Sequence, residues 1–295
     1  MRKIYFSESL DPYFNLAFEE HLLKTGAPGD EVLYLWQNEK TVVIGRNQNP
    51  WKECNLPELE NMGGRLVRRL SGGGAVYHDF GNLNYTFISD YHENKVKENV
   101  ELIIRVLNSF GIQAVFSGKN DIVVGEFKVS GNAYMEDNGR LCHHGTLLVN
   151  ADLEQASRLL TVSKLKLESK GIDSVRARIK NLKEFRSSLT IDDLKIGIAK
   201  EFSNREDFEL EKEVSEQSMA EILELSKHYM SSEWNFGSTP EFDICVSSRD
   251  ESGEVDMYLK VVDGIVVDVR VSTDSLDVNL PDKLYKKMIF TRFAL

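Results

Sequence analysis

Two arginines, a serine and three consecutive glycines stand together at residues 68–74, and residues of these types can bind a phosphate or a carboxylate. Glycine lacks a Cβ atom, so it adopts positive φ and lets a ligand lie against the backbone. Successive backbone N–H groups in such a loop form a concave anion site. Arg68 and Arg69 add permanent charge with a forked geometry that suits both anions. The string predicts a loop that grips a nucleotide or an acyl phosphate, whereas Gly-Gly-Gly alone would indicate only a flexible hairpin loop.

A second pair of charged side chains follows at Asp121 and Lys128. Lys128 stands in the alternating segment 127–130, and a strand lysine that faces a largely apolar pocket suggests a bound anion. The pattern alone gives about equal weight to an outward-facing strand lysine. Asp121 is the natural Mg²⁺ ligand, because one or two carboxylates and phosphate oxygens usually hold magnesium. Spacing alone favours a turn aspartate at that position.

Three histidines accompany these groups, at His78, His143 and His144. Their spacing matches no usual zinc pattern, and Cys142 is the only cysteine near them. We therefore predict that they line the pocket or donate and accept hydrogen bonds there.

Together with the glycine loop, four further stretches occur in the order in which they stand in lipoate–protein ligases, and the chain resembles that family from about Asn15 to near its end. The stretches are Gly45-Arg46-Asn47-Gln48-Asn49, Gly118-Lys119-Asn120-Asp121, Phe127-Lys128-Val129-Ser130-Gly131-Asn132-Ala133 and His143-His144-Gly145-Thr146-Leu147-Leu148. A later run at residues 169–178 also fits. Five separated motifs in order are specific, although any one of them alone is weak.

The resemblance implies an α/β (α+β) fold with mixed β-sheets flanked by helices, as in the biotin/lipoyl ligase-like catalytic domain. It implies that ATP activates lipoate to lipoyl-AMP and that the lipoyl group passes to a specific lysine of an acceptor. Lys128 matches the family's central catalytic lysine, which contacts the acyl carboxylate and the adenylate phosphate. The positions implied to bind ATP and lipoate are Arg69, Ser71, Gly73, Gly74, Ala75, Val76, Tyr77, His78, Asn82, Lys128, Gly131, His144 and Gly145.

The implied acceptors are lipoyl-domain proteins, either E2 subunits of 2-oxoacid dehydrogenases or the H protein of glycine cleavage. We expect neither nucleic acid nor a membrane as a partner. Residues 1–186 hold 24 acidic and 24 basic side chains, so the net charge of −11 lies entirely in residues 187–295. A nucleic-acid binder would more often carry a basic face.

The main alternative is a lipoyl/octanoyl transferase that acts without ATP, through a thioester on an activated cysteine. Related octanoyltransferases carry that cysteine before the Lys128-type motif or late in the domain, whereas residues 118–121 contain none. Cys142, within a predicted strand, is more often a small buried apolar residue. A biotin ligase would show a different Gly-Arg-Gly-Arg-type loop, and a degenerate domain that only binds a partner is disfavoured by the intact motifs.

Length and cysteine usage place these motifs in an ordinary globular chain. The 295 residues suffice for one sizeable core and a smaller second unit. The three cysteines are widely spaced and odd in number, which favours reduced thiols and a cytoplasmic protein. The N-terminus lacks a secretory apolar segment, and the longest apolar runs are too short to cross a membrane.

The elements that must position the motifs divide the chain into two predicted domains. Residues 1–240 form the catalytic domain, and residues 241–295 form a small accessory domain that is shorter than the family's full pattern, either abbreviated or cut. Residues 231–240 are the predicted linker. We expect strands 31–37 and 41–45 to form a hairpin, and we expect the basic segment 163–182 to be a mobile loop that closes over the ligand. Further elements are predicted as helices at 11–23, 95–110, 190–202, 215–229 and 281–288, another helix beginning at Asp152, and strands at 65–69, 82–88, 113–117, 121–124, 126–135, 140–150, 242–247, 255–262 and 265–271.

Overall fold

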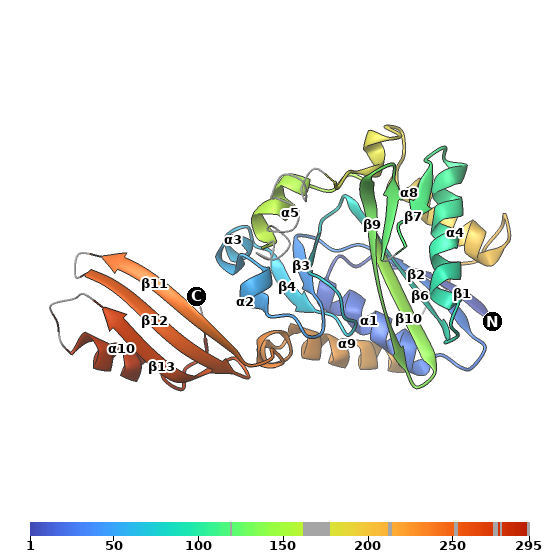
Figure 1. The fold of residues 1–295 in the computed structure, drawn as a ribbon. Helices are drawn as coiled ribbons and strands as arrows, with labels where there is room; N and C mark the ends of the chain where they lie inside the picture. Colours follow the sequence, from blue (N-terminus) through green and yellow to red (C-terminus); the bar gives the residue numbers. More distant parts are fainter. Residues whose placement is uncertain are drawn as a thin grey trace.

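The computed structural model describes residues 1–118, 120–161, 178–211, 214–250, 253–273, 277 and 279–293, and it builds them into three β-sheets with helices around them (Figure 1). The largest sheet has seven strands in the order β1-β2-β6-β10-β9-β8-β7. A small sheet of order β4-β3-β5 lies beside it, and a third sheet, β11-β12-β13, forms a separate unit at the C-terminal end. The predicted α/β class with mixed sheets is confirmed, because β1 and β2 pair in parallel while β6, β10 and β9 pair antiparallel.

The strands are β1 (Arg2–Phe6), β2 (Glu31–Trp36), β3 (Thr41–Ile44), β4 (Arg65–Arg68), β5 (Val76–His78), β6 (Asn82–Asp90), β7 (Ala114–Phe116), β8 (Asp121–Val124), β9 (Phe127–Asp137), β10 (Arg140–Leu148), β11 (Phe242–Asp250), β12 (Gly253–Val262) and β13 (Ile265–Thr273). The α-helices are α1 (Pro12–Thr25), α2 (Pro50–Glu53), α3 (Leu56–Asn61), α4 (Lys95–Ser109), α5 (Leu153–Leu159), α8 (Ile191–Ser203), α9 (Glu216–Met230) and α10 (Leu280–Met288). A 3₁₀ turn, η1 (Leu182–Glu184), and a short π-helix, η2 (Glu233–Gly237), complete the described elements.

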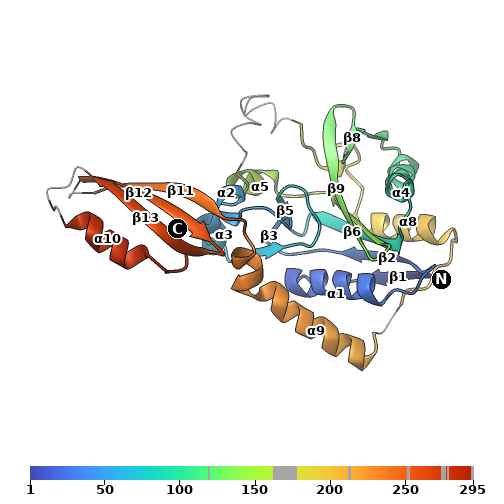
Figure 2. The same cartoon turned by 60° about the horizontal axis from the view of Figure 1, so that its bottom comes forward.

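The large sheet is covered on both faces, and β2 shows how its sequence achieves this. Alternate side chains of a strand point to opposite faces. Val32, Tyr34 and Trp36 therefore pack in one core with α1 and α9, while Leu33 and Leu35 pack in the other core with α4 and α8. Figures 1 and 2 show α1 and α9 together on one side of the sheet. A strand buried on both faces needs a continuous apolar run, which residues 32–36 supply.

Helix α1 begins and ends as its sequence predicts. The side chain of Asp11 accepts hydrogen bonds from the backbone N–H groups of Tyr13 and Phe14, and Pro12 occupies the first turn, where its missing N–H has no cost. The N–H of Gly26 closes the helix by donating to the Leu22 carbonyl. Helix α8 likewise begins with a capping box between Thr190 and Asp193. These local signals fix the ends of both helices.

The predicted hairpin between residues 31–37 and 41–45 is wrong. Strand β2 joins the large sheet between β1 and β6, whereas β3 lies in the small sheet between β4 and β5. The polar turn after β2 therefore carries the chain from one sheet to the other. Strand pairing depends on which distant segments share a core, and the polar turn alone does not determine it.

The predicted linker is an ordered segment that packs against both units. Trp234 of η2 is buried in the core with α1 and α9, and Phe236 of η2 packs against Trp51 of α2 and against the core of the C-terminal unit. That unit consists of an antiparallel meander with α10 along it, as the strand and helix predictions required (Figure 2). Within the described residues, each helix is too short or too polar to cross a lipid bilayer.

Candidate functional site

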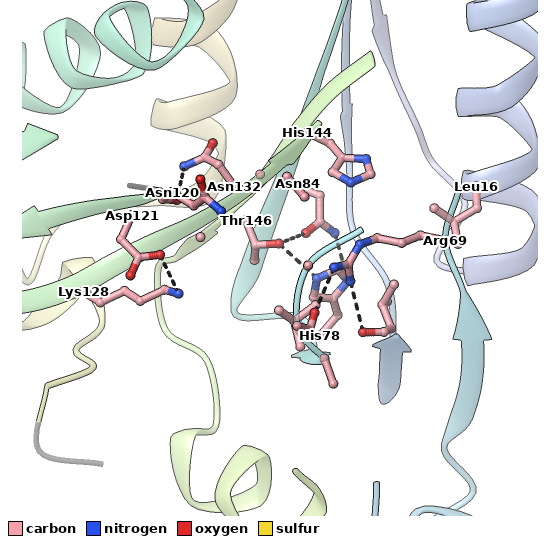
Figure 3. A pocket seen from close by; sticks show the side chains of 18 of the residues that line it. Leu16, Arg69, His78, Asn84, Asn120, Asp121, Lys128, Asn132, His144 and Thr146 are labelled. Carbon is pink, nitrogen blue, oxygen red and sulfur yellow. Dashed lines mark hydrogen bonds and ion pairs between the residues drawn. The ribbon is translucent and has the colours of Figure 1, made fainter. Parts of the chain in front are cut away.

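A cavity of about 260 Å³ lies where the large and small sheets meet, and both motif groups reach it (Figure 3). The residues of its wall come from α1, β2, β3, the glycine loop, β5, β6, β8 and the turn before it, β9 and β10. They are Leu16, Trp36, Val43, Arg69, Gly73, Gly74, Ala75, Val76, His78, Asn84, Asn120, Asp121, Lys128, Gly131, Asn132, Ala133, His144, Gly145 and Thr146.

The glycine loop closes one end of the cavity and is held there by Arg69. The guanidinium of Arg69 donates to the carbonyl oxygens of Gly72 and Gly74 at 2.6 and 2.9 Å, and its Nε donates to Ser71 Oγ at 3.1 Å. Gly73 has φ of +93°, which favours glycine, and a Cβ at Gly45 would lie 2.3 Å from the Gly73 carbonyl oxygen. The loop is therefore a fixed backbone surface.

Buried hydrogen bonds continue from the loop into the protein. Ser71 Oγ lies 2.7 Å from His144 Nε2, and His144 Nδ1 lies 3.0 Å from both carboxylate oxygens of Glu19. Burial opposes the ionisation of Glu19, but contacts with His144, Thr86 and Arg69 outweigh it, so the pKa of this carboxyl lies below its ordinary value. Burial lowers the pKa of Arg69 to about 10, which leaves it charged at neutral pH.

Arg68 has a structural role, contrary to the prediction that its fork faces the ligand. Its side chain is fully buried and points away from the cavity. The guanidinium donates to the carbonyl oxygens of Gln48, Trp234 and Asn235 at 2.6, 3.0 and 2.7 Å, and to Thr239 Oγ1 at 2.9 Å. Side chains of successive strand residues point to opposite sides, so only one of two adjacent arginines can reach the loop.

The opposite end of the cavity carries an ion pair between Lys128 and Asp121 (Figure 3). Lys128 Nζ lies 2.8 Å from Asp121 Oδ1, and each side chain is 37% exposed. A bulge in the β8–β9 pairing, between Ile122 and Val123, brings the two side chains together. Lys128 was expected to face an apolar pocket. It lies instead at the polar, partly exposed end of the cavity, where an incoming anion can compete with Asp121.

Hydrogen-bonded histidines and amides line the wall between the two ends. His78 and His144 belong to this wall, whereas His143 is fully buried behind it, with its Nε2 3.1 Å from Asn132 Oδ1. His78 Nε2 lies 3.0 Å from Thr146 Oγ1, and Thr146 donates to Asn84 at 2.8 Å. Burial, followed by the charge of Arg69, lowers the pKa of His78 to about 3, so its ring is neutral. Gly145 is required here, because a Cβ would lie 2.3 Å from the hydroxyl oxygen of Tyr85.

Three predicted ligand-binding residues lie outside the wall. Ser71 is fully buried behind the loop, Tyr77 packs in a core with Val42 and Ile44, and Asn82 is fully buried and donates no hydrogen bond through its Nδ2 within the described residues. The other predicted residues, Asp121 included, all line the cavity.

The sequence analysis missed the apolar part of the wall and the buried acid behind it. Leu16, Trp36 and Val43 come from α1, β2 and β3, which carry no motif. Glu19 lies one helical turn beyond Leu16, and its only signal was a charged residue among the apolar residues of that helix.

No cysteine of the chain lines the cavity. Cys54 and Cys142 are buried, and burial raises the pKa of the Cys54 thiol to about 12 and that of Cys142 well above its ordinary value. Neither thiol is therefore an activated nucleophile.

Most of the segment predicted to close over the ligand, residues 163–177 of the expected loop 163–182, lies outside the described residues. Its described end runs beside the site, since Lys128 N–H donates to the Arg178 carbonyl at 2.6 Å and Lys180 N–H donates to the Lys128 carbonyl at 3.1 Å. These bonds hold the start of β9 in place.

Comparison with known proteins agrees with the fold. The family model described as the lipoyl protein ligase A/B catalytic domain matches residues 11–203, and the model of the bacterial lipoate protein ligase C-terminus matches residues 239–294. The chain therefore belongs to the lipoate–protein ligase family, as the sequence predicted.

The curated relatives include lipoate-protein ligase A of Bdellovibrio bacteriovorus, 42% identical over 282 residues, which are 93% of this chain and 83% of the relative. Lipoate-protein ligase A of Psychrobacter cryohalolentis is 40% identical over 292 residues, 96% of this chain and 86% of the relative. The predicted class of enzyme, a lipoate–protein ligase, is confirmed.

Among solved structures, P. falciparum LipL1 in complex with lipoate has a TM-score of 0.72 and 29% identity, and covers 100% of this chain and 91% of its own. Lipoate-protein ligase A bound with ATP has a TM-score of 0.69 and 25% identity, with 79% and 97% covered. A bipartite lipoate protein ligase from Thermoplasma acidophilum, studied with its E2 lipoyl domain, has a TM-score of 0.70 and 26% identity, with 79% and 95% covered.

Proposed function

We propose that this cavity is where the enzyme activates lipoate with ATP and from which it passes the lipoyl group to a lysine of an acceptor. One observation carries the assignment. An apolar wall of Leu16, Trp36 and Val43 lies beside two anion-binding features, the glycine loop and the Lys128 ammonium. An acyl chain fits the first, and a carboxylate and a phosphate fit the others.

In the first half-reaction the lipoate carboxylate attacks the α-phosphate of ATP and pyrophosphate leaves. Negative charge accumulates on phosphoryl oxygens, so fixed cations and N–H groups stabilise the transition state. Lys128 exchanges its contact with Asp121 for the carboxylate and the phosphate, while residues 73–76 present the backbone to the nucleotide. In the second half-reaction the acceptor lysine attacks the acyl carbon, and AMP leaves.

A magnesium ion fits beside the phosphates. Asp121 offers a half-exposed carboxylate at the cavity, and magnesium usually takes one or two carboxylates together with phosphate oxygens. When bound there, the ion supplies positive charge to the phosphate oxygens. Asp121 would hold the ion, and Lys128, which pairs with Asp121 in this structure, would then be free to contact the substrate anions.

The acceptors that suit this chemistry are lipoyl domains, either of E2 subunits or of the glycine cleavage H protein, in the cytoplasm. We assign substrate activation to residues 1–240 and an accessory role to residues 241–295, a division supported by the C-terminal strands, which form a sheet of their own.

The decisive experiment measures lipoate-dependent exchange of pyrophosphate with ATP, followed by transfer of lipoate to a purified lipoyl domain. We expect exchange that requires lipoate, and a mass shift on the acceptor lysine that requires ATP. Transfer that does not require ATP and takes the acyl group from an acylated carrier would favour the assignment as a lipoyl/octanoyl transferase. Octanoate as the competing acid measures the preference between the two acyl chains.

A further inference from the structure

Glu19 does not line the cavity, yet two hydrogen-bond chains from the wall end on its carboxylate. The first chain runs from Arg69 through Ser71 and His144. The second runs from Trp36, whose Nε1 lies 3.0 Å from Thr86 Oγ1, and Thr86 Oγ1 lies 2.6 Å from Glu19 Oε2. One buried acid thus connects the glycine loop with the apolar wall.

The direction of each hydrogen bond follows from its donors. Arginine Nε can only donate, so Ser71 Oγ accepts from Arg69 and turns its own hydrogen to His144 Nε2, which is nearer at 2.7 Å than the Gly72 carbonyl at 3.4 Å. His144 then carries its proton on Nδ1 and donates to Glu19. Indole Nε1 also only donates, so Thr86 passes its hydroxyl hydrogen to Glu19 as well.

Two other roles fit these residues less well. Ser71, His144 and Glu19 have the spacing of a nucleophile, a base and an acid, but Ser71 is fully buried behind the loop and its oxygen already accepts from Arg69. Glu19 and His144 also lie near Cys142, with ligand atoms within 4.8 Å, as a metal would require. Their hydrogen bonds to one another satisfy them without an ion.

We propose that Glu19 is a positioning residue, which through His144 and Ser71 fixes Arg69 and the glycine loop for the nucleotide and through Thr86 fixes Trp36. Hydrogen bonds to an ionised acceptor are stronger than neutral ones, and bonds in a chain polarise one another. Glu19 is the acceptor at the end of both chains. Its loss therefore loosens both the glycine loop and Trp36. The inference rests on the proposed binding of ATP at this loop.

The test compares Glu19→Met with Glu20→Met. Methionine matches glutamate in length and accepts almost no hydrogen bond. Glu20 is a buried carboxylate on the same helix, but it binds Lys24 and the hydroxyl of Tyr229, away from the cavity. Both variants lose one buried charge from α1, so a general loss of stability affects both.

We expect Glu19→Met to raise the KM for ATP about 10- to 100-fold, the effect of losing charge-assisted hydrogen bonds. The kcat for exchange at saturating ATP should fall much less, because Lys128 remains. Glu19→Gln, which keeps one acceptor oxygen for His144, should recover most of the affinity. Glu20→Met should change the KM by less than about twofold.

A second measurement needs no variant of Glu19. Nitrogen-15 NMR of histidine-labelled wild-type enzyme, assigned with His144→Gln, should show His144 protonated on Nδ1. Protonation on Nε2, or equal KM changes in Glu19→Met and Glu20→Met, would overturn the inference. If Glu19→Met does not fold, the NMR spectrum and Glu19→Gln decide the question.

Failure of the proposed function gives a different pattern. If Arg69→Met binds ATP as the wild type does, the loop does not hold the nucleotide, and the site assignment fails first. If Arg69→Met weakens ATP binding but Glu19→Met does not, only the inference about Glu19 fails.

Discussion

The two ends of the cavity are built in opposite ways. At the glycine-loop end, Arg69, Ser71, His144 and Glu19 are buried and bound to one another in an unbroken chain. At the other end, Lys128 and Asp121 are each 37% exposed and hold one ion pair. Figure 3 shows Lys128 and Asp121 apart from Arg69 and His144.

The glycine-loop end is therefore a preformed binding surface, whereas at the Lys128 end a substrate can replace an existing contact. A buried chain in which every group has a hydrogen-bond partner resists rearrangement. Breaking one bond leaves a buried polar group without a partner, which costs free energy. A half-exposed ion pair contributes about 0–1 kcal/mol, so a substrate anion displaces it cheaply. We expect substitutions at the buried end to change stability and ATP affinity together, and substitutions at the exposed end to change activity alone.

Lys128→Ala should give the largest loss of activity. Removing the Lys128 ammonium from the open end costs about a hundred- to a thousandfold in transfer of lipoate, because developing phosphoryl charge loses its partner. Lys128→Arg should not restore activity, since Nζ sits within 3.1 Å of the position that a Cβ at Gly131 would occupy. The measurement is transfer to a lipoyl domain, together with the urea unfolding curve.

The control is Lys180→Ala, which removes a lysine from the segment beside Lys128 without touching the cavity wall. Full activity of Lys128→Ala, with normal unfolding, would remove this lysine from the mechanism.

Arg68→Met should give the largest loss of stability. It leaves carbonyl oxygens of Gln48, Trp234 and Asn235 buried without their donor, at a cost of about 3 kcal/mol or more. Urea unfolding measures the free energy of unfolding, and Arg65→Met is the control. Arg65, on the same strand, is exposed, and its substitution should cost less than about 1 kcal/mol. Equal losses in the two variants would contradict the structural role of Arg68.

These arginines show what the sequence can predict and what it cannot. Local signals determined helix ends and tight turns, as with Asp11 at the start of α1 and the Asp263–Gly264 turn, where both residues have positive φ. The glycine loop was equally local, because its residues are neighbours in the chain. Which of Arg68 and Arg69 faces the cavity depends on how β4 is oriented against η2, a contact with residues more than 160 positions away.

The missed residues have the same physical origin. Leu16, Trp36 and Val43 look like ordinary core residues, and only the meeting of α1, β2 and β3 makes them a wall. Glu19 is one of several buried polar residues of α1, and its partners come from the distant strands β6 and β10. The wrong hairpin at residues 31–45 arose likewise, because β2 and β3 take their partners from distant strands.

Acid should lower the free energy of unfolding, because two histidines are buried in their neutral form. Burial lowers the pKa of His143 from 6.5 to about 3, and that of His78 equally. The unfolded chain therefore binds protons that the folded one does not as pH falls from 6.5 towards 3, so stability is lost in that range. Each histidine contributes about 2 kcal/mol of loss at pH 5.

The measurement is urea unfolding at pH 7.5 and pH 5. His143→Gln should reduce the difference between the two free energies by about 2 kcal/mol, while substitution of the exposed His92 by glutamine should leave it unchanged. An unchanged difference in His143→Gln would show that this ring is already charged in the fold.

Asp121→Asn should have a smaller effect, which is confined to the dependence of the exchange reaction on Mg²⁺. Loss of one carboxylate should raise the Mg²⁺ concentration for half-maximal exchange about tenfold, while the free energy of unfolding changes by less than about 1 kcal/mol. Glu136→Gln, an exposed carboxylate further along β9, is the control. A magnesium requirement that Asp121→Asn leaves unaltered would move the metal to another ligand.

The smallest effect is expected from the cysteines, and it separates ligase from acyltransferase. In a variant carrying Cys54→Ser, Cys142→Ala and Cys245→Ser, ATP-dependent transfer should stay within about twofold of wild type, since no thiol lines the cavity and the two buried thiols are protonated. Cys142→Ala removes one buried sulfur and should cost about 1 kcal/mol of stability. The assay follows the mass of a lipoyl domain with and without ATP. Transfer that proceeds without ATP and disappears with Cys142 would mean that the acyl group passes through a thioester, in which case Lys128 would have no phosphate to hold.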